Sequence, residues 1–370
     1  MKMIYIVCNK IRDYHTIIGV RKKVKMQMDA FERAGYEPVY VCFDSYRLYI
    51  QEQTGEKKIS MDYYGKPRQC VDAVIEYIRQ TAPELVYVRY SIIWDSWIEY
   101  FYKELGQLQT RAVCEFYTYP YDSEIAEGNK LIYCDRYYRE NLKDYFKLST
   151  NFQGNTEVLG IPSISMCNGI DTNIPLRSVT KTNPQEINMI AVATLAFWHG
   201  LDRLIEGMHQ YFNTKKNSEW KLYLHIVGEG GESLRLRKMV EDYNLGENVI
   251  FYGRIFDRDK LNEIFDGKDI GIGSIGMHRH TKNMKGSPLK SSEYCMRGLP
   301  FMIDYDDISF DDDYPYIMHV EKNDAPVSMY DVIEFCRKYA NVETAREMRE
   351  YAVKNLTWDA SVKKLINALN

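Results

Sequence analysis

The sequence has no long hydrophobic run: none of its apolar stretches approaches the roughly 18 residues of a membrane-spanning helix. The amino terminus, MKMIYIVCNK, lacks the longer apolar region and the small-residue cleavage site of a signal peptide. These absences predict a cytoplasmic protein, with peripheral contact at the inner face of the membrane left open. The basic stretch RKKVK, Arg21 to Lys25, would suit such a contact, although a solvated helix face explains it more simply.

The sequence also lacks net positive charge, paired cysteines and metal-binding histidine motifs. The formal net charge is -4, which does not favour nucleic-acid binding. The 8 cysteines are scattered without a C-x-x-C pair, as expected of reduced core thiols. The 7 histidines form no H-E-x-x-H or similar pattern. We therefore expect no metal, no cofactor and no nucleic-acid partner.

Short apolar runs instead alternate with amphipathic helical stretches along the chain. This alternation predicts α/β domains with parallel sheets covered by helices, and 370 residues favour two such domains. The aperiodic segment GIDTNIPLRSVTKTNPQE marks their boundary. We expect an N-terminal domain over residues 1–170, a linker over 171–186, a C-terminal domain over 187–356, and a final helix over 357–370 that is able to pack back on the N-terminal domain.

The expected elements follow the same alternation in both halves. In the first half, strands are expected at 3–7, 38–43, 85–90 and 112–117, and helices at 20–34, 71–80, 96–108 and 123–146. In the second half, strands are expected at 190–195, 221–228, 248–253, 269–275, 300–304 and 316–320, and helices at 201–212, 233–243 and 259–265. Because open parallel sheets bind ligands at the carboxyl ends of their strands, the site should lie in the loops that follow these strands.

Four segments between Gly160 and Phe301 are more specific. They are CNGID, then WHGLDRLIEGM, then IVGEGG with VIFYG, and finally SPLKSSEYCMRGLPFMI. Their order resembles the nucleotide-binding half of the retaining glycosyltransferases of family 4, among them bacterial polysaccharide-building members. That family has N-G-I-D before the linker, then K-G-x-D-x-L-I, V-G-x-G and V-x-F-x-G, and a glutamate of an E-x7-E pattern before G-x-P-V-I.

The resemblance implies the GT-B fold, in which two Rossmann-like α/β/α domains face a central cleft. It implies a metal-independent, retaining hexosyltransferase whose donor is a nucleotide diphosphate sugar, with a UDP-sugar favoured. The acceptor would be a glycan or a lipid-linked glycan, as in capsule or exopolysaccharide biosynthesis. Retaining transfer by front-face attack needs no protein nucleophile, so the lack of an obvious catalytic pair does not argue against an enzyme.

The resemblance also assigns the donor site. Glu293 aligns with the glutamate that accepts hydrogen bonds from the ribose hydroxyls, although an ordinary surface glutamate is the alternative. Backbone amides at the helix start would hold the diphosphate, because unpaired amides and the helix dipole both favour an anion. The further residues expected to bind the donor are Gly19, Arg254, Ile255, Ser287, Pro288 and Leu289. Those expected to act in catalysis are Arg279, Lys285 and Lys290.

Three positions depart from the family pattern. Lys285 stands where the first glutamate of E-x7-E is expected, and Thr194 and His199 replace an arginine and a lysine that normally face the diphosphate. The loop GMHRHTKNMKG offers replacement cations, with Arg279 best suited to bind phosphate through two hydrogen bonds. The other basic residues of this loop are His278, His280, Lys282 and Lys285.

A tyrosine-rich segment follows the strand at 112–117. Sugars present C–H faces and hydroxyl groups, which suit aromatic rings and carboxylates, so this segment is the candidate acceptor site. Its residues are Glu115, Tyr117, Tyr119, Tyr121 and Asp122. The 31 tyrosines of the chain make an aromatic cluster a weak signal by itself.

Other functions are compatible with parts of the pattern. The missing cations would also suit a catalytically inactive GT-B subunit that binds glycan or an active partner, and a sugar-nucleotide epimerase shares the two-domain fold. A dehydrogenase is disfavoured, because GEGG lacks the full G-x-G-x-x-G fingerprint. The D-x-D sequence at Asp304 and Asp306 precedes an acidic run and is expected to be an exposed loop rather than a metal site.

Overall fold

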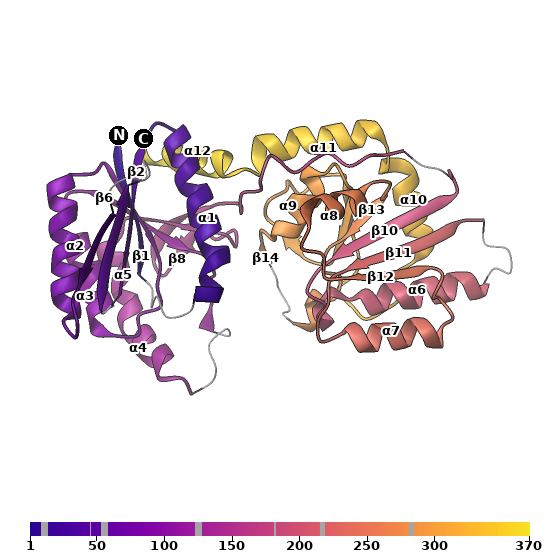
Figure 1. Cartoon of the computed structure of the whole chain (residues 1–370), viewed down its shortest axis with the longest axis horizontal. Coiled ribbons are helices and arrows are strands. Elements are labelled where there is room, and N and C mark those ends of the chain that lie inside the picture. Colours follow the sequence, from indigo (N-terminus) through magenta and orange to yellow (C-terminus); the bar gives the residue numbers. More distant parts are fainter. Residues whose placement is uncertain are drawn as a thin grey trace. The chain divides into compact units, whose positions relative to one another are not determined.

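The structure is a computed structural model that describes residues 1–8, 14–44, 46–52, 58–122, 128–180, 183–214, 219–280 and 285–370. The chain divides into two compact units (Figure 1). The first unit comprises Met1–Cys167 and Trp358–Asn370, and the second comprises Asn168–Thr357. Residues 171–186, where we expected a linker, are thus part of the second unit, and the final helix is part of the first.

The first unit is built on a nine-stranded sheet in the order β4-β3-β2-β1-β5-β6-β7-β9-β8. The strands are β1 (Lys2–Cys8), β2 (Glu37–Phe43), β3 (Arg47–Glu52), β4 (Lys58–Asp62), β5 (Leu85–Arg89), β6 (Arg111–Phe116), β7 (Leu148–Asn151), β8 (Glu157–Val158) and β9 (Ile161–Ser165). The six neighbouring strands β2, β1, β5, β6, β7 and β9 pair in parallel. The strands β3 and β4 at one edge of the sheet and β8 at the other edge pair antiparallel.

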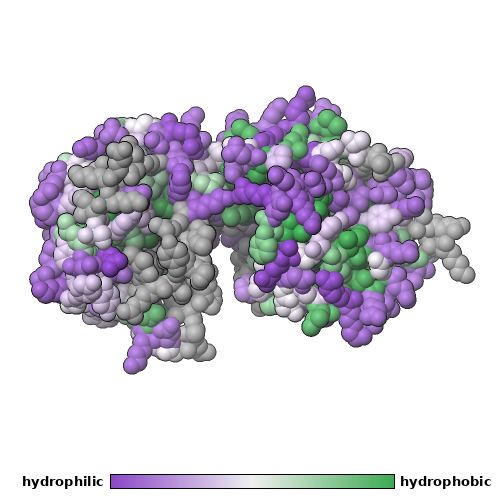
Figure 2. Space-filling model, viewed as in Figure 1, coloured by the Kyte–Doolittle hydropathy of each residue, from purple (hydrophilic) through white to green (hydrophobic). Residues whose placement is uncertain are grey.

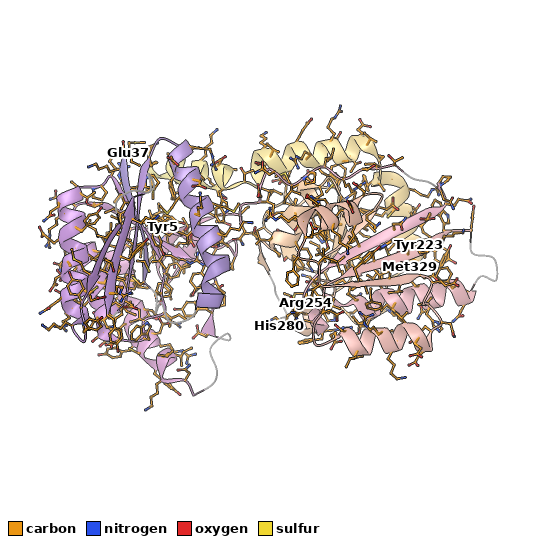
Figure 3. All side chains as sticks on the ribbon, in the orientation of Figure 1. Tyr5, Glu37, Tyr223, Arg254, His280 and Met329 are labelled. Atoms are coloured by element: carbon orange, nitrogen blue, oxygen red, sulfur yellow. The ribbon has the colours of Figure 1, made fainter. Side chains whose placement is uncertain are left out.

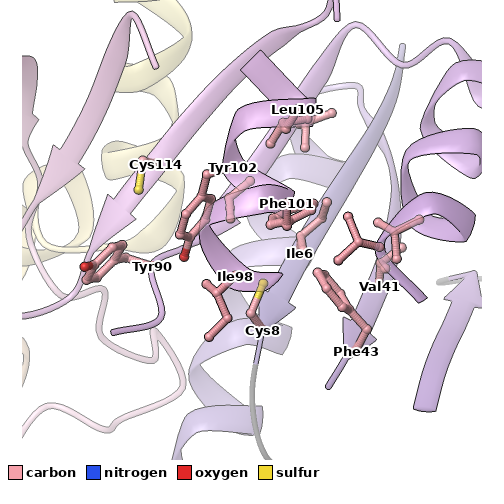
Figure 4. Close-up of a cluster of buried hydrophobic side chains, with 14 of the residues drawn as sticks. Ile6, Cys8, Val41, Phe43, Tyr90, Ile98, Phe101, Tyr102, Leu105 and Cys114 are labelled. Atoms are coloured by element: carbon pink, nitrogen blue, oxygen red, sulfur yellow. The ribbon is translucent and has the colours of Figure 1, made fainter. Parts of the chain in front are cut away.

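Helices cover both faces of this sheet. They are α1 (Tyr14–Arg33), α2 (Pro67–Thr81), α3 (Ser96–Gly106), α4 (Lys130–Tyr138), η2 (Arg139–Asn141), α5 (Leu142–Tyr145) and α12 (Trp358–Leu369). Alternate residues of β1 face opposite sides of the sheet. Ile6 packs in the core under α2 and α3 (Figure 4), whereas Tyr5 packs in the core under α1 and α12. Both β1 residues are fully buried, because the sheet is covered on each side.

The first-unit elements differ from the sequence expectation at helix α1, at the helix expected over 123–146, and at the strands β3, β4, β7, β8 and β9, which were not expected. Helix α1 begins at Tyr14, so Gly19 lies within the helix and not in the loop before it; an isolated glycine is tolerated inside a helix. The helix expected over 123–146 is broken into α4, η2 and α5, and residues 123–127 lie outside the described residues. Strand β7, with the sequence LSTN, was missed because its buried residues are polar.

The second unit has a six-stranded sheet whose strands are all parallel, in the order β12-β11-β10-β13-β15-β17. These strands are β10 (Glu186–Val192), β11 (Lys221–Val227), β12 (Val249–Gly253), β13 (Ile270–Ile272), β15 (Phe301–Ile303) and β17 (Ile317–His319). Numbered along the unit, this is the order 3-2-1-4-5-6 of doubly wound nucleotide-binding sheets, in which the chain reverses direction across the sheet between the first and fourth strands.

Helices and short elements connect these strands. They are η3 (Phe197–His199), α6 (Leu201–Thr214), α7 (Ser233–Asp242), α8 (Arg258–Phe265), η4 (Met277–Arg279), α9 (Leu289–Met296), α10 (Met329–Tyr339), α11 (Val342–Asn355), and the short parallel pair β14 (Lys285–Gly286) and β16 (Asp306–Asp307). The V-G-x-G segment has a packing reason: a Cβ at Gly228 would lie 1.8 Å from the Ala193 carbonyl oxygen, and one at Gly230 would lie 2.2 Å from that of Leu195. The loops after β10 and β11 therefore pack backbone against backbone.

The residue hydropathy of the surface can be seen in Figure 2. Hydrophilic residues predominate on the face shown in Figure 2. Among the described residues, no helix combines the length and the hydropathy required to cross a membrane.

A buried charged network ties the sheet of the first unit to α1. Glu115 on β6 is 0% exposed, and its carboxylate accepts hydrogen bonds from Arg89, from Gln27 Nε2 at 2.6 Å and from the Tyr87 hydroxyl at 2.9 Å. Burial alone would raise the pKa of the Glu115 carboxyl, but the charges of Arg89 and Lys23 lower it to a net value below its usual range. Glu115 was a candidate acceptor ligand; its oxygens are instead buried and bonded to neighbours within the unit.

Lys23 belongs to the same region. Its ammonium lies 3.9 Å from the ring centroid of Phe152 and 5.4 Å from that of Trp358 on α12. Burial lowers the pKa of Lys23 to about 8. This lysine of the basic stretch is therefore packed against the first-unit core and does not belong to a solvated helix face.

We predict that Glu115→Ala strongly destabilises the protein, because it leaves the Arg89 guanidinium buried without its carboxylate. Loss of one partner of a buried ion pair costs about 3–5 kcal/mol, which corresponds to a fall in melting temperature on the order of 10 °C for a unit of this size. Differential scanning calorimetry measures the change. Asp72→Ala is the control, because Asp72 is exposed and its carboxylate accepts a hydrogen bond from the Tyr100 hydroxyl at 2.9 Å. Equal melting temperatures for the two variants would contradict the structural role of Glu115.

Candidate functional site

The candidate donor residues lie at one edge of the second-unit sheet. Thr194 and His199 follow β10, Arg254 and Ile255 follow β12, and His278 and Arg279 follow β13. Figure 3 shows Arg254 and His280 at this end of the sheet and Met329 at the opposite end. Parallel pairing brings these loops to the same edge, since the carboxyl ends of parallel strands point the same way.

The start of α9 is strongly electropositive. Its N-cap residue, Pro288, makes no side-chain capping bond, and its first turn has no acidic residue but contains Lys290. A cation in the first turn opposes the helix dipole, so this arrangement is unfavourable unless an anion lies nearby. Lys290 is half-buried, and its ammonium has neither an ion pair nor a hydrogen bond with any described residue. Burial lowers the pKa of Lys290 to about 8.

His199 lies close to Lys290. Burial, with the Lys290 charge as the second cause, lowers the pKa of His199 to about 3, so its imidazole is neutral at physiological pH. Its Nδ1 accepts a hydrogen bond from the Ala196 amide at 3.2 Å, which places the proton on Nε2. Within the part of the chain that is described, this Nε2–H has no acceptor. A neutral donor and a cation thus lie together beside the start of α9.

Ser287 anchors the loop that enters α9. Its Oγ accepts from the Asn168 amide at 2.9 Å and from the Ser309 hydroxyl at 2.6 Å, and its carbonyl accepts from Asn168 Nδ2 at 2.8 Å. Ser287 is 4% exposed, so it holds the loop in place and does not face a ligand. The Asn168 of N-G-I-D has the same role, which the resemblance alone did not reveal.

Glu293 is held by a residue that the sequence analysis missed. Arg297, one helical turn later, donates from Nε at 3.1 Å and from Nη2 at 2.9 Å to Glu293 Oε1. Arg297 is itself buried, donates to Asn262 Oδ1 at 2.9 Å and lies 4.0 Å from the ring centroid of Phe265. Oε2 of Glu293 makes no hydrogen bond with a described residue, and the side chain is 31% exposed. The Glu–Arg spacing of four residues was the available signal.

Two of the cations expected in the loop after β13, His278 and Arg279, are bonded to carboxylates. Arg279 Nη1 donates to Asp202 at 2.9 Å and to the Phe197 carbonyl at 3.1 Å, and its Nε donates to Asp324 at 2.6 Å. His278 bridges Asp304 and Asp324. These side chains brace the loop, because acidic residues distant in sequence neutralise Arg279. Lys282 lies outside the described residues.

Asp304 is buried, contrary to the expected exposed loop. It is 2% exposed and accepts from the Met277 amide at 2.9 Å, which caps the short helix η4. Asp306 is exposed, and its backbone lies opposite that of Lys285 in the small parallel sheet of β14 and β16. The residues that the structure describes contain no group of ligands suited to hold a metal ion.

The other candidate donor residues are more exposed. Thr194, Arg254, Lys285 and Leu289 are exposed, and Ile255 is half-buried. The carboxylate of Glu229 senses the Arg254 charge, which is one of the smaller causes that lower the pKa of Glu229. Their places at the carboxyl edge are compatible with ligand contact, which stays a prediction.

The acceptor candidates of the first unit divide into two groups. Tyr121 is buried and donates to Asp135 at 2.7 Å, and Asp122 forms ion pairs with Arg136 and Arg139. By contrast, Tyr117 is 37% exposed with the Arg89 guanidinium 4.3 Å from its ring centroid, and Tyr119 is half-buried. Only the last two present aromatic surface for a ligand among these candidates.

The second unit matches a known family. Residues 174–302 match the model of the family described as "Glycosyl transferases group 1". A comparison with curated proteins gives no significant sequence match.

Solved structures resemble the chain over its whole length. A glycosyltransferase from Rickettsia africae ESF-5 is 13% identical with a TM-score of 0.63, covering 99% of this chain and 97% of that chain. The lipopolysaccharide outer core galactosyltransferase WaaB is 12% identical with a TM-score of 0.60, covering 100% and 99%. A protein titled trehalose-6-phosphate from E. coli, bound with UDP-2-fluoro glucose, is 11% identical with a TM-score of 0.60, covering 100% and 99%.

At such low identity these likenesses establish the fold, whereas the family match rests on the sequence of the second unit. The chain has the GT-B fold, and its residues 174–302 carry the sequence pattern of the group 1 glycosyl transferases.

Proposed function

We propose that the protein is a retaining, metal-independent glycosyltransferase of family 4. It transfers a hexose from a nucleotide diphosphate sugar, with a UDP-sugar favoured, to a glycan or lipid-linked acceptor in capsule or exopolysaccharide biosynthesis. The observation that carries this proposal is the pair of unpartnered donors, Lys290 and the Nε2–H of His199, beside the uncapped start of α9.

The proposed reaction places charge where these donors lie. The bond between the anomeric carbon and the β-phosphate oxygen breaks, and the acceptor oxygen bonds to the anomeric carbon on the same face. The proton of the acceptor hydroxyl passes to the departing phosphate, which leaves as a nucleoside diphosphate. The leaving group gains negative charge, so preorganised donors aimed at it stabilise the transition state. Lys290 supplies a charge, and His199 supplies a neutral hydrogen bond.

The ribose fits at Glu293. Arg297 donates to Oε1 of Glu293, which leaves Oε2 for hydrogen bonds from ribose hydroxyls. Glu293 lies three residues after Lys290 on α9, which is about one helical turn. The catalytically inactive alternative is less well supported, because an unbalanced half-buried cation is costly to keep without a ligand.

We predict that Glu293→Gln weakens UDP binding about 10- to 100-fold, because a charged acceptor of ribose hydroxyls is lost. Isothermal titration calorimetry measures the affinity. Glutamine keeps an amide oxygen for Arg297 but loses the carboxylate charge, so the melting temperature of the variant is measured first to check that it is folded. Glu241→Gln, an exposed glutamate on α7, is the matched control and should bind UDP like the wild type. Unchanged affinity in Glu293→Gln would rule out the ribose contact.

A second prediction follows from the lowered pKa of Lys290. The bound diphosphate favours the ammonium form, so binding takes up a proton once the pH exceeds the free value of about 8. UDP affinity should be nearly constant from about pH 7 to the pKa and then fall up to about tenfold per pH unit.

Two substitutions separate charge from shape at this position. Lys290→Met should bind UDP at least about tenfold more weakly at pH 7 and should lose the pH dependence. Lys290→Arg keeps its charge at all these pH values, so its affinity should stay flat. Titrations of the three proteins between pH 7 and pH 9.5 decide the question, and a flat wild-type profile would contradict a phosphate contact at Lys290.

We also propose that the protein is cytoplasmic and contacts the inner face of the membrane peripherally through α4. Leu131, Tyr133 and Tyr137 of this helix are 42%, 63% and 76% exposed. The exposed cation Lys130 lies on the same helix, whereas Arg136 is ion-paired with Asp122. Tyrosine at the headgroup level with basic neighbours suits an anionic lipid surface, where a lipid-linked acceptor would be held.

Sedimentation with vesicles tests this contact. Wild-type protein should sediment with vesicles that contain anionic phosphatidylglycerol and much less with pure phosphatidylcholine, and added salt should weaken the binding. Tyr133→Ser with Tyr137→Ser should reduce the bound fraction several-fold, whereas Tyr64→Ser, at a residue 71% exposed, should not. Binding that is equal for all three proteins, or absent from the wild type, would refute the contact.

A further inference from the structure

Three aromatic rings border the proposed phosphate site. Phe197 and Trp198 lie on η3, after β10, and His280 follows η4, after β13. The ring centroids are 5.0 Å apart for Phe197 and Trp198, 5.0 Å for Trp198 and His280, and 6.4 Å for Phe197 and His280. We call these residues the aromatic group. Phe197 is 43% exposed, His280 is exposed and Trp198 is half-buried, so the group presents ring surface outward.

The backbone under the aromatic group is firmly anchored. The Trp198 carbonyl accepts from the Gly276 amide at 3.2 Å, and the Phe197 carbonyl accepts from Arg279 Nη1 at 3.1 Å. Gly200, with a φ of 67°, lets the two loops touch, since a Cβ there would lie 2.7 Å from the Gly276 nitrogen. The ion pairs of Arg279 hold this backbone in place, so the rings are already ordered before a ligand binds. Ordering in advance reduces the entropy lost when a ligand stacks on the rings.

The aromatic group continues directly into the phosphate-facing residues. His199 follows Trp198, their ring centroids are 5.9 Å apart, and His199 senses the charge of Lys290. In a nucleotide diphosphate sugar, the sugar ring is attached directly to the β-phosphate. A ligand whose phosphate contacts His199 therefore has its sugar within reach of the neighbouring rings. The C–H face of a pyranose carries partial positive charge and suits the negative face of an aromatic ring.

We infer that the aromatic group, centred on Trp198, binds the hexose ring of the donor. This inference rests on the proposed function, because it requires the diphosphate to lie at His199 and Lys290. The group occupies the segment where two cations are expected from the family resemblance. The chain thus binds the sugar end of its donor by ring stacking, with positive charge supplied separately from α9.

Calorimetry with paired ligands tests the inference. Each nucleoside diphosphate (UDP, GDP and ADP) is titrated alongside its hexose conjugates. Trp198→Ala should bind the preferred nucleotide sugar about three- to tenfold more weakly than the wild type does, as expected for the loss of one aromatic contact, while its affinity for the free nucleoside diphosphate stays within about twofold. Trp198→Phe should retain most of the sugar-dependent affinity.

Controls make every outcome decisive. His280→Ala alters an exposed ring and should show the same selective loss, which guards against misfolding of the Trp198 variant. Tyr330→Ala, at a residue 50% exposed on α10, should bind both ligands like the wild type. Equal losses for nucleotide and nucleotide sugar, or no loss of sugar binding, would overturn the inference while leaving the proposed function intact. A wild type that binds no nucleoside diphosphate at all would overturn both.

Discussion

Parallel pairing of the six second-unit strands decides where every candidate donor residue lies. The order β12-β11-β10-β13-β15-β17 places β10 and β13 side by side at the centre of the sheet, so the loops that follow these two strands pack against each other at its carboxyl end. His199 follows the first strand and Arg279 the second, while α9 delivers Lys290 to the same edge. Without this strand order, residues almost a hundred positions apart could not share a site.

Electrostatics then separates bracing residues from ligand candidates at that edge. Arg279 and His278 look like phosphate ligands in isolation, yet carboxylates at Asp202, Asp304 and Asp324 balance them. Lys290 has no such balance among the described residues. Because a helix start already favours an anion, an unbalanced lysine in its first turn concentrates positive potential at one point. Lys290 is therefore a better candidate for an anion contact than Arg279 or His278.

The departures from the family pattern form a consistent set. Where two cations are expected, the chain has the neutral His199 and an aromatic group, and Lys290 stands on the facing helix. Glu293 keeps its place and gains a buried partner in Arg297. Under the proposed function, these features correspond to a site in which the positive charge lies on a different element while the carboxylate proposed to bind ribose keeps its position.

The sequence by itself determined the α/β class, the central strands of both sheets and the resemblance of the second unit to glycosyl transferases. Hydrophobic runs such as those of β1 and β11 are long enough to predict buried parallel strands, and glycines such as Gly228 indicate close contact between backbones. The tertiary structure alone decided which charges are paired. Glu115 and Arg279 were predicted to contact ligands, and only folding shows that each has an ion-pair partner distant in sequence. Local pattern reports on burial and backbone shape, whereas the balance of charge at a site depends on contacts between segments far apart in the chain.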